Sequence, residues 1–487
     1  MPAVHKVQNL IDGAWCDGHT DLCLPVINPA TGEKIASVSL AQSIDIENAL
    51  QSSARGFGVW RATLASGRQK ILEHAAQLIT ERAENIAQNL TREAGKPLAE
   101  ARMEIGAAVD VLRWYAEEGK RAYGRLVPPR VPGMRQMVIR EPVGPVIAFV
   151  AWNFPAINFM RKVAGALAAG CSITIKPSEE TPMTGVAFAQ AFADAGLPNG
   201  VLNVIYGDPA QISAQMCASS IPRKLTFTGS TEVGKHLSKL AADNLLRCTM
   251  ELGGHAPFIV FDDADIDQAA TMMVAGKFRN AGQVCVSPTR FYVQRGVHDA
   301  FLEKVVEKAE AIVVGDGLDP KTTMGPLISP RRIAVMEALL DDAIKHGAGV
   351  AFQGQVPNTN GSFFAPVILR DVSEDAQIMQ EEPFGPIAPV LPFDTFDDVM
   401  ARANGMPVGL AAYAFTSSAQ RAAMVADQMD AGMLAINSMH IASPETPFGG
   451  IGWSGQGAEG GPEGLDTFLR TRVVTEIFNT PERVGDA

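Results

Sequence analysis

Long apolar runs, which a membrane-spanning segment requires, are missing from the sequence. The longest apolar stretch runs from about Val143 to Trp152 and is interrupted by Gly144 and Pro145. It is far shorter than the roughly 20 residues that cross a bilayer. The first ten residues alternate polar and apolar side chains and contain no apolar signal core. These absences predict a cytoplasmic protein that has no membrane partner.

An excess of basic residues is also missing. The 53 acidic side chains outnumber the 41 lysines and arginines and leave a formal net charge of −12. Proteins that bind nucleic acid need a basic face that neutralises phosphates. The composition therefore speaks against a nucleic-acid partner and leaves small molecules as the expected ligands.

Metal-binding and disulfide patterns are absent as well. The six cysteines contain no C-x-x-C pair, and the eight histidines contain neither H-x-x-x-H nor H-E-x-x-H. Zinc sites and disulfide frameworks are built from such pairs. We therefore expect no metal and no disulfide framework.

The sequence does contain enough apolar side chains for more than one core. With 487 residues, of which 47% are hydrophobic, the chain should form two or three domains. From residue 145, short apolar runs alternate with amphipathic segments. The strand candidates are Val146–Val150, Ser172–Lys176, Val201–Ile205, Lys224–Thr228 and Arg247–Glu251, and the helix candidates lie near 156–169, 182–195, 209–218 and 231–243. This alternation predicts a doubly wound α/β domain, whose ligands bind beyond the carboxyl ends of parallel strands.

The remaining segments differ in character. Residues 1–40 indicate short strands joined by turns, and a second alternating stretch from about 256 to 450 predicts a second α/β domain. Amphipathic patterns typical of helices cover residues 44–58, 63–95 and 98–122. Residues 123–142 are rich in proline and β-favouring side chains and predict an extended hairpin outside the domain. A last strand is expected at Arg472–Ile477.

The loop Gly229–His236 lies where a strand candidate meets a helix candidate, a position where backbone amides can bind phosphate. It matches the G-x-x-x-x-G-K loop of nucleotide hydrolases, but His236 stands where Ser or Thr must hold magnesium. It does not contain the G-x-G-x-x-G dinucleotide fingerprint. Taken alone, the loop leaves a nucleotide site and a turn that only permits close packing both open.

Four polar side chains stand at strand ends or turns where chemistry could use them. Glu179 could bind ribose hydroxyls, and Glu251 could serve as a general base. Cys285 could be an activated thiol or an inert small hydrophobe. Asn153 could donate to an oxyanion or cap a helix. Taken alone, each of these residues could equally have a purely structural role.

Seven ordered segments together resemble the aldehyde dehydrogenase superfamily over about residues 8–478. They are WNFP at 152–155, KPSE at 176–179, FTGSTEVG at 227–234, ELGG at 251–254, GQVC at 282–285, EEPFGP at 381–386 and PFGG at 447–450. Their joint occurrence is highly specific and removes the nucleotide-hydrolase interpretation. The resemblance implies an enzyme that oxidises an aldehyde to a carboxylic acid with NAD(P).

The resemblance also implies the catalytic residues. Cys285 corresponds to the nucleophile, and Glu251 to the base that activates the thiol or the deacylating water. Asn153 and the backbone N–H of Cys285 correspond to the oxyanion hole. In the implied reaction the thiolate adds to the aldehyde, hydride passes to the nicotinamide, and water hydrolyses the thioester. The presence of Glu251 favours hydrolysis over transfer to coenzyme A.

The same resemblance implies the cofactor-binding residues. They are Trp152, Lys176, Ser178, Glu179, Gly229, Ser230, Glu382 and Phe384. Lys176 and Glu179 would hold the adenosine ribose, and Ser230 would contact the pyrophosphate. Glu382 and Phe384 would position the nicotinamide ribose and ring. An acidic Glu179 would repel a 2′-phosphate, so we expect NAD in preference to NADP, without excluding NADP.

The substrate prediction depends on two arginines. Arg161 lies eight residues, about two helical turns, after Asn153, and Arg290 lies five residues after Cys285. Their placement resembles the succinate-semialdehyde dehydrogenase branch, in which arginines would pair with the far carboxylate of the substrate. Ser443 lies near a serine that assists there, although its spacing differs by one residue. A structural ion pair is the alternative for each arginine.

Departures from the family pattern and rival functions remain. Ser287 stands where some members carry a second cysteine, so no redox switch is expected, and Gly452 and Trp453 replace the usual residues after the PFGG segment. Oxidation of general aliphatic or aromatic aldehydes stays open. A non-catalytic binding or structural protein is a further alternative, which retention of Cys285 and Glu251 argues against. A cationic aldehyde is disfavoured by the arginines.

The resemblance finally implies a three-part architecture. A cofactor domain would use residues 1–121 and 144–251, and a catalytic domain residues 252–455. Residues 122–143 and 464–487 would form a small β excursion that pairs strands across subunits and so protects otherwise open edges. We therefore expect a homodimer or a homotetramer.

Overall fold

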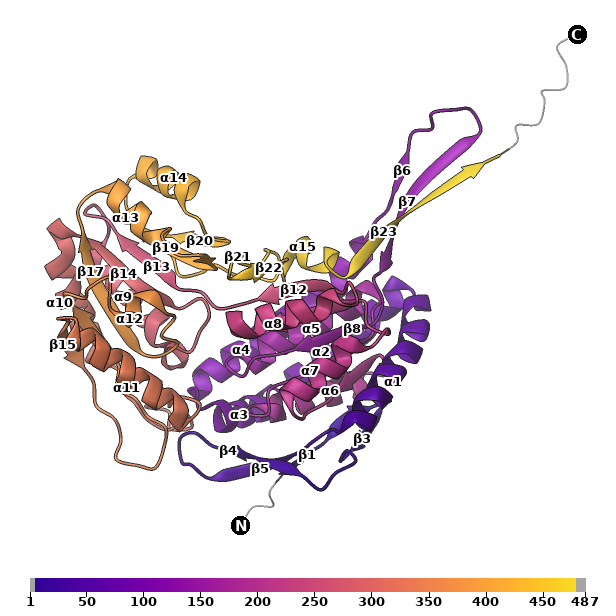
Figure 1. Ribbon diagram of the computed structural model, residues 1–487, viewed down its shortest axis with the longest axis horizontal. Coiled ribbons are helices and arrows are strands. Elements are labelled where there is room, and N and C mark those ends of the chain that lie inside the picture. Colours follow the sequence, from indigo (N-terminus) through magenta and orange to yellow (C-terminus); the bar gives the residue numbers. More distant parts are fainter. Residues whose placement is uncertain (1–4, 479–487) are drawn as a thin grey trace, which may run out of the picture.

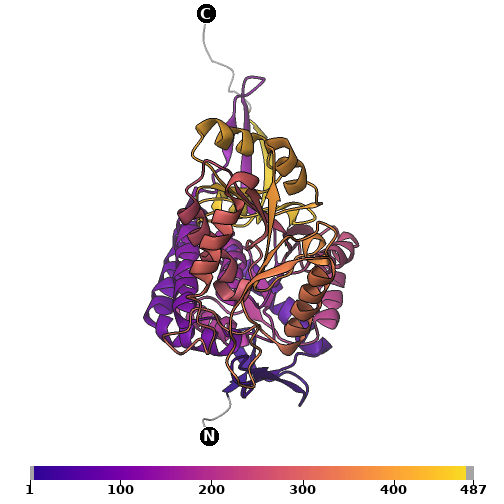
Figure 2. The same ribbon diagram turned by 90° about the vertical axis from the view of Figure 1, so that its left-hand side faces the viewer.

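Two mostly parallel sheets, each covered by helices, make up most of the fold (Figure 1). The computed structural model describes residues 5–478 of the chain. Figure 2, turned by 90°, places the half built on the second sheet in front of the half built on the first. The predicted α/β class, with a doubly wound sheet, a second α/β sheet and a small β excursion, is confirmed.

The first sheet has eight strands in the order β22-β12-β11-β8-β9-β10-β2-β3. Its five central strands are parallel and are β8 (Val146–Phe149), β9 (Ile173–Lys176), β10 (Leu202–Val204), β11 (Lys224–Thr228) and β12 (Arg247–Glu251). The edges add β2 (Asn9–Ile11), β3 (Ala14–Cys16) and β22 (Gly455–Gln456) in antiparallel pairings. The five predicted strands are confirmed to within two residues. The strand order reverses between β8 and β11, which is where ligands bind in such sheets.

Helices cover both faces of this sheet. Its crossover helices are α5 (Pro155–Ala169), α6 (Pro182–Asp194), α7 (Pro209–Ala218) and α8 (Thr231–Ala242). The N-terminal helices are α1 (Ser43–Ala62), α2 (Ala65–Glu81), α3 (Ala83–Ala94) and α4 (Leu98–Glu118), followed by a short 3₁₀ turn, η1 (Gly119–Arg121). The segment predicted as helical over 63–95 divides at Arg82, whose ψ of 2° departs from helical geometry and whose guanidinium pairs with Asp194 at 2.7 Å.

The second sheet has seven strands, parallel except at one edge. Their order is β15 (Gly349–Gln353), β16 (Val367–Arg370), β17 (Ile387–Phe393), β14 (Pro288–Gln294), β13 (Ala256–Val260), β19 (Ala411–Phe415) and β20 (Met433–Ile436). The surrounding helices are α9 (Ile266–Phe278), η2 (Arg279–Gly282), η3 (Arg295–Val297), α10 (His298–Ala309), α11 (Pro330–Lys345), α12 (Gln377–Gln380), α13 (Phe396–Ala403) and α14 (Ala419–Gln428). Phe258 lies in the core of this half, and its ring centroid is 5.4 Å from that of Phe291 and 4.7 Å from that of Phe415.

Three further small sheets complete the chain. The N-terminal one contains β1 (His5–Val7), β5 (Lys34–Ser39) and β4 (Cys23–Ile27). Another pairs β18 (Val408–Gly409) with β21 (Ile451–Gly452), after which α15 (Gly461–Asp466) leads into the last strand. None of the helices within residues 5–478 combines the length and hydropathy of a membrane span.

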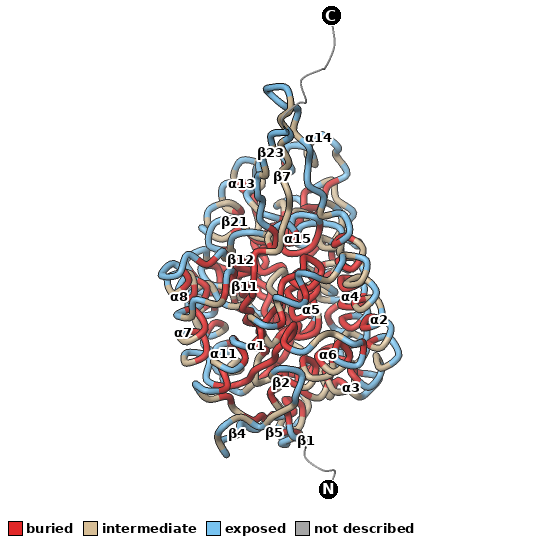
Figure 3. Tube along the Cα trace, turned by 90° about the vertical axis from the view of Figure 1, so that its right-hand side faces the viewer, coloured by how far each residue is buried: buried red, intermediate tan, exposed pale blue. Residues whose placement is uncertain are grey.

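The third small sheet projects from the body as an arm. It consists of β6 (Arg125–Val127), β7 (Met134–Pro142) and β23 (Leu469–Ile477), and β23 pairs with β7 along its whole length. Figure 3 shows this arm as exposed or half-buried, whereas α5 and β11 are largely buried. The predicted hairpin and last strand are confirmed. Strand pairing across subunits stays a prediction, and residues 1–4 and 479–487 of the predicted parts lie outside the described residues.

Candidate active site

Cys285 lies where two cavities meet. A cavity of about 370 Å³ and another of about 360 Å³ are both lined by Cys285 and Asn153. The second cavity also contains Glu251 and opens toward the carboxyl ends of the first sheet. The structure therefore brings the three predicted catalytic residues together from three distant parts of the chain.

Local backbone geometry presents Cys285 to the cavities. Asn280 and Ala281 have φ values of 48° and 53°, and Gly282 follows at 73°. Such left-handed conformations are costly for residues with a side chain and persist only where the surroundings enforce them. A side chain at Gly282 would meet the Gly385 carbonyl oxygen at 2.2 Å, so only glycine fits this turn. The thiol is therefore held by a strained loop rather than by a helix or strand.

Charges around Cys285 act in opposite directions. Burial and the neighbouring Glu382 and Glu251 carboxylates raise the pKa of the thiol to about 12. Arg161 and a hydrogen bond from the backbone N–H of Cys285 itself lower this pKa. Activation of the thiol therefore requires a proton acceptor in the site.

Glu251 has the properties of such an acceptor. It is buried at the end of β12, and neither carboxylate oxygen has a hydrogen-bond partner within the described residues. Burial and the nearby Glu459 raise its pKa well above the usual range, whereas Lys162 and Arg161 oppose this. A carboxylate with a raised pKa binds a proton more readily than an exposed one, which suits a general base.

Asn153 lies between β8 and α5, and its side-chain amide contacts the turn that carries Cys285. Its Nδ2 donates to the carbonyl oxygen of Gln283 at 3.1 Å, and its Oδ1 accepts from Nδ2 of Asn158 at 3.4 Å. A side-chain amide carries two N–H donors, so one remains for a ligand beside the thiol. This arrangement can stabilise an anion that forms on a carbon attacked by sulfur.

A third cavity, of about 510 Å³, lies beyond the carboxyl ends of β8, β9 and β11. Six of the predicted cofactor residues line it, namely Trp152, Lys176, Ser178, Glu179, Gly229 and Ser230. The α8 N-terminus, with Ser230 as its cap, opens onto this cavity. A side chain at position 229 would lie 2.3 Å from the Phe227 ring, so there is no room for one and the backbone of the loop stays accessible. The site fits a dinucleotide, because amide donors at a helix start bind phosphate.

The carboxylate of Glu179 is fixed in place. Lys176 Nζ lies 2.6 Å from its Oε1, and the backbone N–H of Gly207 donates to the same oxygen at 3.1 Å. Both side chains line the third cavity, so one cation and one anion face any ribose bound there. A ribose hydroxyl can donate to such a carboxylate, whereas a phosphate would be repelled.

Glu382 and Phe384 lie at the Cys285 end of the second cavity. Phe384 has a φ of 47° and meets Trp152 edge to face, with ring centroids 5.7 Å apart. Burial raises the pKa of Glu382 to about 8, although Arg332 and Lys277 lower it. All eight predicted cofactor residues therefore line the second or third cavity.

Arg161 lines the first cavity together with Cys285. It is buried on α5, and its guanidinium carbon lies 3.9 Å from the centroid of the Phe448 ring. Among residues 5–478 it makes neither a hydrogen bond nor an ion pair with another side chain or backbone group. A buried guanidinium with unused donors is suited to an anionic ligand.

The other two predicted substrate residues do not line the cavity. Arg290 on β14 donates to the carbonyl oxygens of His255, Arg402 and Ala403, at 2.8, 3.0 and 2.9 Å. These contacts use its guanidinium to join two backbone segments and so favour a structural role, and its role in substrate binding stays a prediction. The Ser443 hydroxyl lies 3.3 Å from Oγ1 of Thr446, and only its neighbour Ala442 lines the cavity.

Sequence reasoning missed two parts of the site. Arg279, six residues before Cys285, lines the first cavity with its guanidinium carbon 5.0 Å from the Phe154 ring. The sequence shows that polar residues precede Cys285, but it does not show that the Arg279 side chain lines the cavity. The ion pair between Lys162 and Glu459 lies behind Glu251 and joins residues too distant in sequence for any spacing rule.

Comparison with known proteins gives full-length matches. The model of the aldehyde dehydrogenase family matches residues 15–474. The chain is 46% identical to 4-(hydroxymethyl)benzenesulfonate dehydrogenase of Comamonas testosteroni, over 96% of this chain and 97% of that protein. It is 41% identical to the NADP⁺ succinate-semialdehyde dehydrogenase of Escherichia coli, with the same two coverages.

Solved structures match equally well. An NADP-dependent enzyme of E. coli superposes with a TM-score of 0.96 at 40% identity, covering 97% of this chain and 98% of that chain. The succinate-semialdehyde dehydrogenase of Burkholderia pseudomallei superposes with a TM-score of 0.96 at 38% identity, covering 98% and 99%.

Proposed function

The chain belongs to the aldehyde dehydrogenase family, and on that premise we propose that it oxidises an anionic aldehyde to the acid through a thioester on Cys285. One observation carries the anionic part of this proposal. Arg161 is buried, lies on the wall of the cavity that reaches Cys285, and has unused donors among the described residues. A substrate whose far end is a carboxylate or a sulfonate would use those donors.

The residues of the site divide the chemistry between them. Glu251 takes the thiol proton, and the sulfur adds to the aldehyde carbon while the carbonyl oxygen becomes an anion. Asn153 Nδ2 and the Cys285 backbone N–H donate to that anion, and losing one such donor typically costs ~3 kcal/mol. The bound dinucleotide supplies the hydride acceptor. Once Glu251 has passed the thiol proton to solvent, it takes a proton from water, whose oxygen attacks the thioester carbon. The C–S bond then breaks and releases the acid and the thiolate.

The proposed cofactor is NAD, with NADP used less well. The Glu179 carboxylate, fixed by Lys176 and Gly207, supports this preference because it would repel a 2′-phosphate. The comparisons leave the choice open, since similar structures include a 3,6-anhydro-L-galactose dehydrogenase described with NAP and a Bacillus cereus enzyme described with NAD⁺.

Two kinds of anionic aldehyde fit this proposal. Succinate semialdehyde is the first, supported by the semialdehyde dehydrogenases among the relatives. An aromatic aldehyde with an acidic substituent is the second, because the apolar side chains of Phe154, Ile157 and Phe448 line the same cavity as Arg161 and Cys285. The relative of Comamonas testosteroni is named for a benzenesulfonate. Both substrates carry an aldehyde and an anionic group, and they differ in whether an aliphatic chain or an aromatic ring joins the two.

Matched substrate pairs test the proposal. Succinate semialdehyde is compared with butyraldehyde, and 4-formylbenzenesulfonate with benzaldehyde, in wild type, Arg161→Met and Arg161→Lys. We expect Arg161→Met to lower kcat/KM for the anionic member by roughly 10- to 150-fold, because a hydrogen bond to a charged group contributes about 1.5–3 kcal/mol. The neutral member should lose much less, because it feels only the effect of Arg161 on the pKa values of Cys285 and Glu251. Arg161→Lys should recover part of the loss.

Each outcome has a clear meaning. Equal losses for anionic and neutral aldehydes would show that Arg161 does not bind the anion of the substrate and would remove the anionic assignment while leaving the enzyme class. The larger loss within one pair identifies whether the middle of the substrate is aliphatic or aromatic. Full turnover by Cys285→Ala would contradict the thioester itself.

A further inference from the structure

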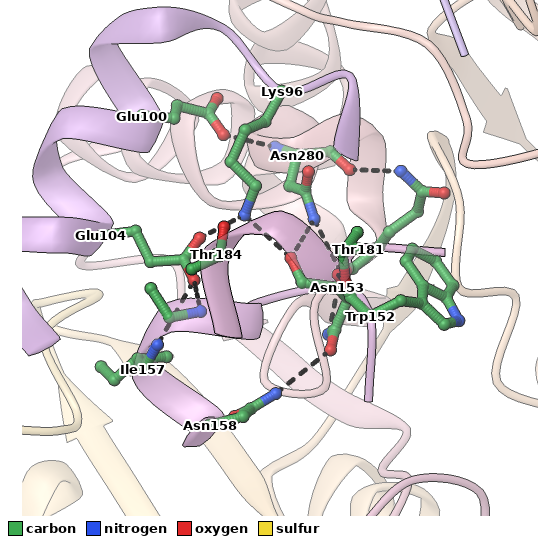
Figure 4. Close-up of polar contacts among 12 residues, drawn as sticks. Lys96, Glu100, Glu104, Trp152, Asn153, Ile157, Asn158, Thr181, Thr184 and Asn280 are labelled. Carbon is green, nitrogen blue, oxygen red and sulfur yellow. Dashed lines mark hydrogen bonds and ion pairs between the residues drawn. The ribbon is translucent and has the colours of Figure 1, made fainter. Parts of the chain in front are cut away.

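Lys96 is a fully buried lysine that contacts the backbone of the turn carrying Asn153. It follows Gly95, whose φ of 82° ends α3, and precedes α4. Its Nζ lies 2.5 Å from the Glu104 carboxylate and donates to the main-chain carbonyl oxygen of Asn153 at 2.8 Å (Figure 4). The same Nζ lies 3.9 Å from the centroid of the Phe154 ring. The cation therefore joins the Glu104 carboxylate of α4 to the turn that carries Asn153.

Glu104 holds the other side of that turn. The Phe154 cap position of α5 has no side-chain cap, and the Glu104 carboxylate accepts instead from the backbone N–H groups of Ala156 and Ile157, at 2.8 and 3.4 Å. A carboxylate at a helix start is favourable both as a hydrogen-bond acceptor and toward the helix dipole. Lys96 therefore binds the carbonyl group of this turn, and Glu104 binds the backbone N–H groups that follow it.

The Cys285 loop is tied to the same point. Asn280 Nδ2 donates to the carbonyl oxygen of Asn153 at 3.1 Å and to that of Gln283 at 3.2 Å. The Asn280 backbone N–H donates to Glu100, one helical turn before Glu104 on α4, at 2.9 Å. The carbonyl of Asn153 therefore accepts from Lys96 and from the strained loop together, as Figure 4 shows.

Stability alone does not explain a lysine at this position. Desolvation of a buried ion pair commonly cancels its attraction, and apolar replacements of similar volume are often neutral or stabilising. A long apolar side chain could fill the same space, but it could not donate to the Asn153 carbonyl. The groups that Lys96 contacts belong to the turn and the helix start beside the thiol.

We propose that Lys96, paired with Glu104, is a positioning residue that sets the Asn153 amide against Cys285 and thereby supports stabilisation of the oxyanion. This inference rests on the proposed role of Asn153 as the oxyanion donor. Lys96 lines none of the three cavities, whereas its partner Glu104 also lines the first one. The effect of Lys96 on the rate should therefore pass entirely through Asn153.

The variant Lys96→Met keeps the apolar stem and removes the donor and the charge. With propionaldehyde, which needs no anion site, we expect kcat to fall by roughly tenfold or more, because misplacing an oxyanion donor forfeits much of what it contributes. The KM for NAD should stay unchanged. Lys224→Met is the matched control, since Lys224 is also buried over a phenyl ring but donates to Thr249 in β12 instead of to the Asn153 turn. That control should retain the wild-type kcat.

A double-mutant cycle with Asn153→Ala separates positioning from general damage. If Lys96 acts through Asn153, Lys96→Met should change kcat by less than about twofold in the Asn153→Ala background, because the group that it positions is gone. Independent, multiplying losses, or an unchanged kcat in Lys96→Met alone, would overturn the inference. If Asn153→Ala itself kept the wild-type kcat, the proposed oxyanion donor would fail first.

Glu104→Gln keeps the question answerable if Lys96→Met does not fold. Its amide oxygen can still accept from Ala156, while the ion pair to Lys96 is lost. We expect a smaller fall in kcat that also disappears in the Asn153→Ala background. A fall that persists there would overturn the inference equally.

Discussion

At the scale of single residues, the chemistry depends on how neighbours set the protonation of Cys285 and Glu251. Burial raises the pKa of both groups, so neither carries its charge as readily as it would in water. Arg161 lowers both pKa values and lies in the cavity where an anionic substrate would bind. Substrate recognition and thiol activation are therefore coupled through one guanidinium.

The raised pKa of Glu251 predicts the direction of the pH profile. A general base must be deprotonated, and a carboxylate with a raised pKa loses its proton only at higher pH, so kcat should rise with pH across the neutral range. Glu251→Gln should lower kcat by roughly 100-fold or more, and the rise that remains should follow ionisation of the Cys285 thiol, whose pKa is raised to about 12, without levelling off. Steady-state rates from about pH 6 to about pH 9 test both points. An unchanged profile in the variant would assign the base elsewhere.

Glu179 gives a prediction about cofactor choice. Glu179→Gln removes the charge that would repel a 2′-phosphate, so the ratio of kcat/KM for NAD to that for NADP should fall by roughly tenfold. Glu180→Gln is the control, because Glu180 pairs with Arg331 instead of Lys176. A ratio that changes equally in both variants would contradict a specific role for Glu179.

Sequence reasoning was uneven at this scale. Helical periodicity placed Arg161 on the side of α5 that faces the cavity, two turns from Asn153. Arg290 was predicted from the family resemblance and its spacing after Cys285, which do not show that β14 directs this side chain toward backbone carbonyls. Lys96 was not noticed, since nothing local to the GKP segment indicates contact with residues 57 positions later.

At the scale of elements, the departure after the PFGG segment has a structural explanation. Gly452, in β21, has a φ of 59°, and a side chain there would meet the Pro407 carbonyl oxygen at 2.4 Å. Trp453 is half exposed, and Lys235 from α8 lies 3.3 Å from the centroid of its ring. The unusual pair therefore joins the last segment to the helix that begins at the dinucleotide cavity.

Gly452→Ala tests this explanation. The left-handed backbone and the close carbonyl should together lower the stability by about 1–3 kcal/mol. Gly106→Ala is the matched control, because Gly106 lies inside α4 with open space around it, and alanine there should leave stability equal or slightly higher. Thermal unfolding of both variants gives the comparison. Equal stability in Gly452→Ala would contradict the requirement for glycine.

The helices and strands themselves were largely predictable. Buried parallel strands read as short apolar runs, and the crossover helices follow from their amphipathic spacing, so the first sheet was found almost to the residue. The break at Arg82 was not found, because a single departure from helical ψ leaves no composition signal. The curled η2 loop was not found either, since its left-handed residues are Asn280 and Ala281.

At the scale of the whole molecule, the arm is the feature that the monomer leaves unexplained. Its edge strands β6 and β23 have unpaired outer edges within the described chain, and Leu126, Val473 and Ile477 are each about two-thirds exposed. Proteins seldom leave long apolar edge strands uncovered. We therefore keep the proposal that arms pair between subunits of a homodimer or homotetramer.

Charge placed on the arm tests that proposal. Val473→Asp combined with Ile477→Asp should reduce the mass measured by light scattering by at least half, since a buried charge without a partner costs more than most interfaces tolerate. Leu64→Asp is the control, because Leu64 is at least as exposed but lies on the body. A wild-type mass in the arm variant would show that the arm is not the interface.

The central claim is the thioester on Cys285, and the most direct measurement is the intact mass of Glu251→Gln after incubation with NAD and an anionic aldehyde. We predict an added mass equal to the acyl group of the aldehyde, located by peptide mapping on Cys285 and absent from the double variant that also carries Cys285→Ser. Acid formed at the wild-type rate with no adduct, or an adduct on another residue, would contradict the claim.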